Sequence, residues 1–249
     1  MIGGWLNRFL PTAGSAHAAE FDGVLAAVHT DGALIFLSWL VVFANILVRF
    51  RARPGVAPGQ PAGSRWPLAA IALVVAGDVW LLAGSALPAW YARAVPAPAG
   101  AVEVRVVGEQ FAWNFHYPGP DLEFGRTDRA LITAADPIGI DRTDAAAKDD
   151  FVLIGLFVVP VDHDVVVHLS SKDVIHSFTL ATMRVKQDVT PGLPVTTWFR
   201  PIATGSWEVG CSQLCGLGHY RMRALFDVRT GEAWNAFVAD EVARIQDAP

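Results

Sequence analysis

Residues 206–223 read SWEVGCSQLCGLGHYRMR and contain both cysteines of this 249-residue chain. Cys211 and Cys215 are separated by three residues, and Gly216 and Gly218 follow them. Glycine lowers the stability of a helix by about 1 kcal/mol relative to alanine, so two glycines at this spacing disfavour a helix here. The segment is therefore predicted to be a loop that joins two strands.

The residue types that follow the cysteines indicate a metal site. His219 follows Cys215 by four positions, and Met222 comes three positions later. Thiolates, an imidazole and a thioether are soft donors, and such a set selects copper over harder ions. A structural zinc would take four Cys or His ligands and has no use for methionine. A disulfide is the other alternative in an oxidising compartment, but it leaves His219 and Met222 without a role.

The two cysteines also bear on the number of metal ions. A mononuclear electron-transfer copper uses one Cys, two His and a weak axial Met, whereas this segment offers two thiols. A second imidazole is expected upstream, and His176 in SSKDVIHSF (170–178) is the best candidate, at the end of a strand-like run. Two thiolates, two imidazoles, a thioether and a backbone carbonyl suit two coppers bridged by both sulfurs. For the other histidines we expect surface or core positions: His17, His29, His116, His163 and His168.

Composition restricts the class of protein. Hydrophobic residues make up 53% of the chain and charged residues only 17%, which excludes a disordered chain and is too apolar for an ordinary soluble domain. Two cysteines exclude a small scaffold held by many disulfides. The net charge is −5. Residues 1–100 carry six Lys/Arg and four Asp/Glu, a balance of +2, whereas residues 101–249 carry thirteen Lys/Arg and twenty Asp/Glu, a balance of −7. This acidic balance argues against a nucleic-acid partner.

Two long apolar runs predict membrane spans at about residues 22–48 and 67–90. Residues 32–48 carry no charge, and the second run is interrupted only by Asp78. A helix needs about 20 apolar residues to cross a bilayer. Trp66, Trp90 and Tyr91 lie at the ends of the second run, where aromatic side chains favour the headgroup region. The alternative is a pair of core helices in a soluble protein.

The loop between the runs, residues 49–66, sets the expected orientation. It contains four arginines and no acid (Arg49, Arg51, Arg53 and Arg65). Short loops rich in Lys and Arg stay on the cytoplasmic side, so both termini are predicted to lie outside. Ala16-His17-Ala18 resembles a signal-peptidase site, but no apolar core precedes it. We therefore expect an external N-terminal segment that is not cleaved.

Asp78 lies near the middle of the second predicted span. An ionised carboxyl there costs about 2.5–3.5 kcal/mol on insertion scales and rarely faces lipid. It could face a partner or a proton path, or it could be a protonated carboxyl hydrogen-bonded to another helix. Either alternative indicates that the two helices pack against a larger membrane partner.

Residues 98–249 are predicted to form an external all-β domain, after a hairpin of residues 1–97. Alternating or β-branched runs bounded by Gly, Pro, Asp or Ser are typical of a sandwich or barrel; they are AVEVRVV (101–107), FVLIGLFVV (151–159), DVVVHLS (164–170), TTWFR (196–200), SWEVG (206–210) and RALFDV (223–228). Residues 118–150 hold eight acids and four bases and are predicted to be a long surface loop, or else an acidic docking or ion-holding surface. Residues 231–248 show helical spacing of apolar residues, which predicts a short C-terminal helix.

The Cys-x3-Cys-x3-His-x2-Met pattern, with DVIHSF upstream and two N-terminal spans, resembles subunit II of the haem–copper cytochrome c oxidases over nearly the whole chain. This resemblance implies a cupredoxin-like Greek-key barrel on a two-helix transmembrane hairpin, with a dinuclear copper centre called CuA. Carried over by position, Cys211 and Cys215 would bridge both coppers. His176 and Met222 would complete one copper, and His219 with the backbone carbonyl of Gln213 would complete the other.

The segment GEQFAWNFHYPG (108–119) resembles the family's aromatic stretch, through which electrons enter from cytochrome c. Phe111 replaces the usual tryptophan at the first aromatic position and Trp113 matches the second, so these two are the candidates for the point of electron uptake. Gln213 replaces a glutamate that commonly reaches a magnesium shared with subunit I. An amide is a weaker ligand for a hard cation, which argues against magnesium here. No C-x-x-C-H motif occurs, so no c-type haem is expected in this chain.

The resemblance implies a respiratory electron carrier in a bacterial plasma (inner) membrane. The subunit would accept electrons from cytochrome c, which docks on the acidic external domain, and pass them to haem in subunit I. There oxygen is reduced to water and protons are translocated, so no oxygen site is expected in this chain. Subunit III and membrane lipid are further expected partners. The alternatives are a CuA subunit of a nitric-oxide-reducing relative and a membrane-tethered copper carrier or assembly factor.

Overall fold

The computed structural model describes residues 8–51, 54–55 and 65–247. The chain forms two compact units: a helical unit, chiefly Glu20–Val95, and a β unit, Pro11–Ala19 together with Pro96–Pro249. Most of the arginine-rich loop predicted at 49–66, including Arg53, lies outside the described residues, as do the first seven residues of the predicted external N-terminal segment.

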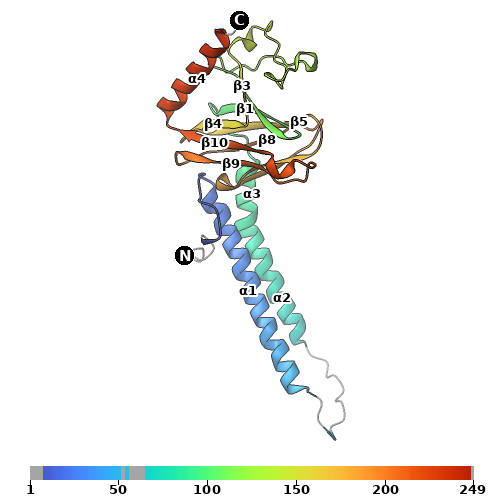
Figure 1. Cartoon of the computed structure of the whole chain (residues 1–249). Coiled ribbons are helices and arrows are strands. Elements are labelled where there is room, and N and C mark those ends of the chain that lie inside the picture. Colours follow the sequence, from blue (N-terminus) through green and yellow to red (C-terminus); the bar gives the residue numbers. More distant parts are fainter. Residues whose placement is uncertain (1–7, 52–53, 56–64, 248–249) are drawn as a thin grey trace. The chain divides into compact units, whose positions relative to one another are not determined.

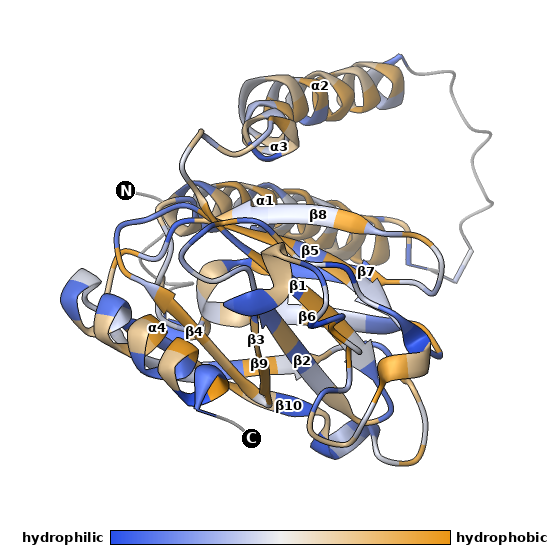
Figure 2. Cartoon of the chain, turned by 90° about the horizontal axis from the view of Figure 1, so that it is seen from above, coloured by the Kyte–Doolittle hydropathy of each residue, from blue (hydrophilic) through white to orange (hydrophobic). Residues whose placement is uncertain are grey.

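The helical unit consists of two helices that are long and apolar enough to cross a membrane. The first is α1 (Ala18–Arg49); the second is continuous over Trp66–Ala94 and comprises α2 (Trp66–Leu81), a short π-helical turn (Leu82–Ala86) and α3 (Leu87–Ala94). They are 32 and 29 residues long with a mean hydropathy of 2.0 over their most apolar windows, so each exceeds the length that a bilayer requires. Apolar residues cover most of α1 and α2 (Figure 2). Both helices extend a few residues beyond the predicted spans.

The β unit contains two five-stranded sheets (Figure 1). The first has the order β3-β2-β1-β5-β8 and the second β4-β10-β9-β6-β7. The strands are β1 (Val102–Glu109), β2 (Ala112–Tyr117), β3 (Phe151–Ile154), β4 (Leu156–Pro160), β5 (Val165–Ser171), β6 (His176–Leu180), β7 (Val185–Val189), β8 (Val195–Phe199), β9 (Gly205–Cys211) and β10 (Arg223–Arg229). The prediction of a cupredoxin-like all-β domain is confirmed, in the form of a two-sheet sandwich.

Aromatic side chains join the two sheets in the core. Phe115 of β2 stacks on Phe157 of β4 with ring centroids 4.7 Å apart, and Phe157 also contacts Phe226 of β10 at 5.3 Å. All three rings are fully buried, and burial of each aromatic side chain stabilises the fold by about 1.5–3 kcal/mol. The two sheets are therefore held face to face by this core.

The run FVLIGLFVV, predicted as one strand, is divided at Gly155. Residues before it form β3 in one sheet, and residues after it form β4 in the other. Gly155 has φ +69°, a conformation that glycine adopts without a steric penalty. Its N–H donates to Trp113 and its carbonyl accepts from Leu225, with N···O distances of 2.9 Å. This glycine thus lets the chain change sheets while it remains hydrogen-bonded to both.

The C-terminal helix α4 (Gly231–Gln246) is confirmed. Thr230 caps its N-terminus, because its hydroxyl accepts from the Ala233 N–H at 3.3 Å. Trp234 packs against Tyr117 and Phe237 against Phe151, with centroids 5.9 and 6.1 Å apart. The helix therefore packs on the core where β2 ends and β3 begins.

A short N-terminal segment, Pro11–Ala19, belongs to the β unit. The sequence assigns all of residues 1–97 to the hairpin, so this segment differs from the predicted domain boundary. Gly14 donates to the Thr182 carbonyl at 2.8 Å and accepts from the Ile202 N–H at 2.9 Å, and the Ser15 hydroxyl donates to the Met183 carbonyl at 2.8 Å. Ala18, the last residue of the Ala16-His17-Ala18 tripeptide, is fully buried. Residues 11–19 are thus built into the folded β unit.

Residues 118–150 form the predicted long surface loop, with two short 3₁₀ turns at Arg129–Leu131 and Ala146–Lys148. Its carboxylates bind its own backbone. Asp136 accepts from three successive N–H groups, those of residues 138–140, at 2.7–3.1 Å. Asp150 is buried and contacts His116 at 2.7 Å. The acids that suggested a docking surface therefore also order the loop.

Candidate metal centre

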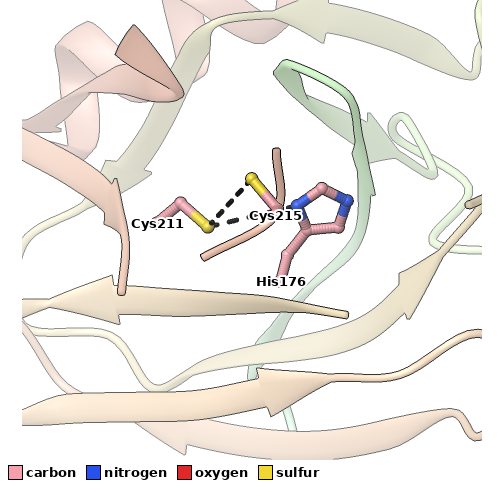
Figure 3. A group of neighbouring side chains, drawn as sticks. All are labelled: His176, Cys211 and Cys215. Carbon is pink, nitrogen blue, oxygen red and sulfur yellow. Dashed lines mark hydrogen bonds between the residues drawn. The ribbon is translucent and has the colours of Figure 1, made fainter. Parts of the chain in front are cut away.

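Three segments bring the predicted metal ligands together at one end of the second sheet. His176 is the first residue of β6, and Cys211 is the last residue of β9, which pairs with β6 at Phe178. The prediction that His176 ends a strand was wrong: β5 ends at Ser171, and the chain crosses to the other sheet before β6 begins. The loop after β9 then returns Cys215 to the same place (Figure 3).

The two sulfurs and one ring nitrogen form the centre of the cluster. The Sγ atoms of Cys211 and Cys215 are 3.9 Å apart, and Cys211 Sγ lies 4.0 Å from His176 Nδ1 (Figure 3). A disulfide requires about 2.05 Å, so these cysteines are free thiols. Two sulfurs that share one metal at about 2.3 Å each can lie up to ~4.6 Å apart. The thiol pair therefore fits a shared metal and does not form the disulfide considered above.

The other predicted ligands surround these sulfurs. Cys215 Sγ lies 3.6 Å from His219 Nδ1 and 3.6 Å from Met222 Sδ. Cys211 Sγ lies 3.2 Å from the backbone carbonyl oxygen of Gln213. The four other predicted donors thus gather around the two cysteine sulfurs, and the chemistry of the six is soft except for the single carbonyl.

Burial controls the chemistry of the centre. His176 is fully buried, and Cys215 and Met222 are 5% and 2% exposed. Burial raises the pKa of the Cys215 thiol to about 11, and the neighbouring Cys211 adds to this rise. Without a metal the thiol is protonated at neutral pH, so a metal ion must displace its proton on binding.

The two aromatic candidates for electron uptake differ in exposure. Trp113 is fully buried, and its ring meets His176 edge-on with centroids 5.9 Å apart. Phe111 is half-buried. A Cβ atom added to Gly216 or Gly218 would lie 3.1 or 2.3 Å from the Phe111 ring. A donor protein therefore cannot contact Trp113 directly, whereas Phe111 packs on the backbone of the metal-binding loop.

Comparison with known proteins identifies the family of the chain. Residues 102–228, about half of the chain, match the family model described as cytochrome C oxidase subunit II, periplasmic domain. The chain belongs to the cytochrome c oxidase subunit II family. The chain thus combines a domain of the kind that this family model describes as periplasmic with two helices that are long and apolar enough to cross a membrane.

Two bacterial relatives bear the name of this family. The chain is 37% identical over 156 residues to the alternative cytochrome c oxidase subunit 2 of Bradyrhizobium diazoefficiens, covering 62% of this chain and 56% of that one. It is 28% identical over 227 residues to the cytochrome c oxidase subunit 2 of Cereibacter sphaeroides, covering 82% and 72%. The crystal structure of the periplasmic domain of subunit II (CoxB) of Bradyrhizobium japonicum covers 60% of this chain and 99% of that one, with 25% identity and a TM-score of 0.45.

Two residues of this subunit II that the sequence did not single out lie next to the ligands. Asp173 accepts a hydrogen bond from His176 Nε2, and Gln110 donates to the Cys215 carbonyl. Burial raises the pKa of Asp173, but hydrogen bonds from His176 and the backbone N–H groups of Gln110 and Val174 outweigh it and lower the pKa overall. A carboxylate three positions before a ligand histidine is a signal that could have identified Asp173.

The surface around the centre is apolar rather than acidic. Leu214, Leu217 and Tyr220 of the ligand loop are 80%, 98% and 83% exposed. Lys172, which lies beside the ligand segment, forms an ion pair with Glu109 at 2.6 Å. Residues 118–150, which lie outside the ligand loop in the sequence, contribute −4 of the net charge of −7 over residues 101–249.

Proposed function

We propose that the β unit binds a dinuclear copper centre of the CuA type, which accepts electrons from cytochrome c and delivers them to haem in subunit I. The observation that carries this proposal is the pair of free thiols 3.9 Å apart, with two imidazoles, a thioether and a carbonyl oxygen next to them. When bound by Cys211 and Cys215, two coppers would spread one electron over both metals, so that gain or loss of the electron would require little movement of the ligands.

The residues of the chain supply the conditions for this chemistry. Cys211 and Cys215 would bind as thiolates, and His176 and His219 would offer the Nδ1 atoms that lie 4.0 Å from Cys211 Sγ and 3.6 Å from Cys215 Sγ. Met222 is 2% exposed and, with Cys215, excludes water from the buried side. A site that excludes water and holds its ligands by packing lowers the reorganisation energy of electron transfer.

Electron uptake is proposed at Phe111. Its half-buried ring is the aromatic group that packs on the ligand loop, while Trp113 is buried against His176. The net charge of −7 over residues 101–249 would attract a basic cytochrome over long range. The exposed apolar residues of the ligand loop would then make the short-range contact.

The helical unit is proposed to cross a bacterial plasma membrane twice, with loop 49–66 in the cytoplasm and both termini outside. Asp78 is exposed on α2, which suits a residue that faces subunit I or a proton path. Subunit III is a further proposed neighbour. A magnesium shared with subunit I is not proposed, because Gln213 offers a neutral amide in place of a carboxylate.

Metal analysis of the full chain, purified with its oxidase partners, tests the proposal. We expect two coppers per chain and a mixed-valence EPR signal. We expect Cys215→Ser to abolish that signal and Ser212→Ala, in the same loop, to retain it. One copper per chain would overturn the proposal in favour of a copper carrier, and zinc would overturn it outright. Reduction of nitric oxide instead of oxygen by the purified complex would reassign the partner subunit.

A further inference from the structure

The carboxylate of Asp173 connects two parts of the metal-binding region. One oxygen, Oδ1, accepts from His176 Nε2 at 2.8 Å and from the Val174 N–H at 2.7 Å. The other, Oδ2, accepts from the backbone N–H of Gln110 at 2.7 Å. Asp173 therefore holds a ligand imidazole on one side and the start of the β1–β2 turn on the other.

The hydrogen bond to Asp173 determines which ring nitrogen of His176 can bind a metal. When Nε2 carries the proton and donates it to the carboxylate, Nδ1 keeps its lone pair. Nδ1 is the atom that lies 4.0 Å from Cys211 Sγ. A carboxylate in this position fixes the tautomer and the orientation of a ligand histidine and makes it more basic.

Gln110 extends the connection to the second ligand segment. Its side-chain Nε2 donates to the carbonyl of Cys215 at 2.6 Å, while its backbone N–H binds Asp173. The next residue, Phe111, packs on Gly216 and Gly218. A continuous set of hydrogen bonds thus runs from His176 through Asp173 and Gln110 to Cys215, and it includes the residue that precedes Phe111.

We infer that Asp173 is a positioning residue of the copper centre, which holds the His176 imidazole and, through Gln110, fixes the Phe111 segment relative to both ligand segments. The inference rests on the proposed function. As a consequence, one carboxylate holds both the proposed point of electron uptake at Phe111 and the metal ligands in fixed positions. The negative charge of this carboxylate would also stabilise the oxidised form of the centre.

Two substitutions separate the orienting role of Asp173 from its charge. In Asp173→Asn the amide oxygen can still accept from His176, but the amide NH₂ cannot accept from the Gln110 N–H. We expect two coppers to remain, with a reduction potential shifted upward because the negative charge is lost. Asp173→Ala removes every side-chain hydrogen bond, so we expect an altered EPR hyperfine pattern and a loss of copper affinity of about 10–100-fold in chelator competition.

The control is Asp188→Asn in the full chain with its partners. Asp188 is an exposed carboxylate on β7, so this change removes the same charge without touching the ligand network. We expect wild-type EPR and copper affinity and a smaller shift in potential than in Asp173→Asn. If Asp173→Ala misfolds, Asp173→Asn, which conserves the shape of the side chain, still provides the potential and the spectrum.

The outcomes distinguish this inference from the proposed function. A wild-type chain without a mixed-valence signal overturns the function itself. A normal wild-type signal, with the copper affinity and hyperfine pattern of Asp173→Ala matching those of Asp188→Asn, overturns the positioning role of Asp173 alone. A loss of copper affinity and an altered hyperfine pattern in Asp173→Ala, with two coppers retained in Asp173→Asn, support it.

Discussion

Gly218→Ala is expected to destabilise the β unit because the added methyl group would occupy the space of the Phe111 ring. An ideal Cβ atom at Gly218 would lie 2.3 Å from Phe111 Cδ2 and 2.6 Å from Cγ. Gly218 has φ −92° and ψ 7°, a conformation that alanine also adopts, so backbone strain adds little. Overpacking of this kind costs about 1–3 kcal/mol.

Thermal unfolding of the full chain measures the effect. For a chain of this size each 1 kcal/mol shifts the Tm by about 2–4 °C, so a decrease of about 2–12 °C is expected. Gly210→Ala is the matched control, since no atom lies within 4 Å of its added Cβ. We expect a change within about 0.5 kcal/mol there.

A double-mutant cycle tests whether Phe111 is the cause. In a Phe111→Ala background the ring is absent, so Gly218→Ala should cost less than about 0.5 kcal/mol. The reasoning is refuted if Gly218→Ala leaves the Tm unchanged, or if its penalty is the same with and without the Phe111 ring.

Three further predictions follow from the site and the core. Phe111→Ala should slow electron uptake from cytochrome c in stopped-flow measurements while two coppers remain bound; an unchanged rate would place the point of uptake elsewhere. Tyr117→Phe should lower the free energy of unfolding by about 1–3 kcal/mol in urea titrations, because the buried hydroxyl both donates to and accepts from Val158 at 2.9 Å. Burial raises the pKa of Tyr117, so the fold favours the neutral phenol and the wild type should lose stability above about pH 10; an equal alkaline loss in the Phe variant would contradict this. Copper affinity in chelator competition should rise from pH 6 to pH 8, since the Cys215 thiol, whose pKa is about 11, must release its proton; affinity independent of pH would show that the thiol does not bind as a thiolate.

Local patterns in the sequence were sufficient to predict which segments form helices or strands and which side chains of the Cys211–Met222 segment could bind a metal. Long apolar runs predict α1 and α2, because a bilayer imposes a length and an apolar composition that are visible in any window of about 20 residues. The alternation in residues 101–107 predicts β1, because successive side chains of a strand face opposite sides. The four ligands of residues 211–222 are close in sequence and hence predictable as a group. The need for a second imidazole indicated His176, and the resemblance to subunit II added the Gln213 carbonyl and the assignment of each donor to one of the two coppers.

Only the tertiary structure decided how distant segments meet. Gln110 and Cys215 are 105 positions apart, and His176 and Cys211 are 35 apart, so no local pattern indicates that they share a hydrogen-bond network or a site. The change of sheet at Gly155 was equally hidden, because an apolar run has the same composition whether it serves one sheet or two. Local sequence determines which residues form strands and which can bind a metal, through properties of each residue and its neighbours. Which strands pair, and hence which carboxylate orients which imidazole, depends on burial of the whole core and becomes visible only when the chain is folded.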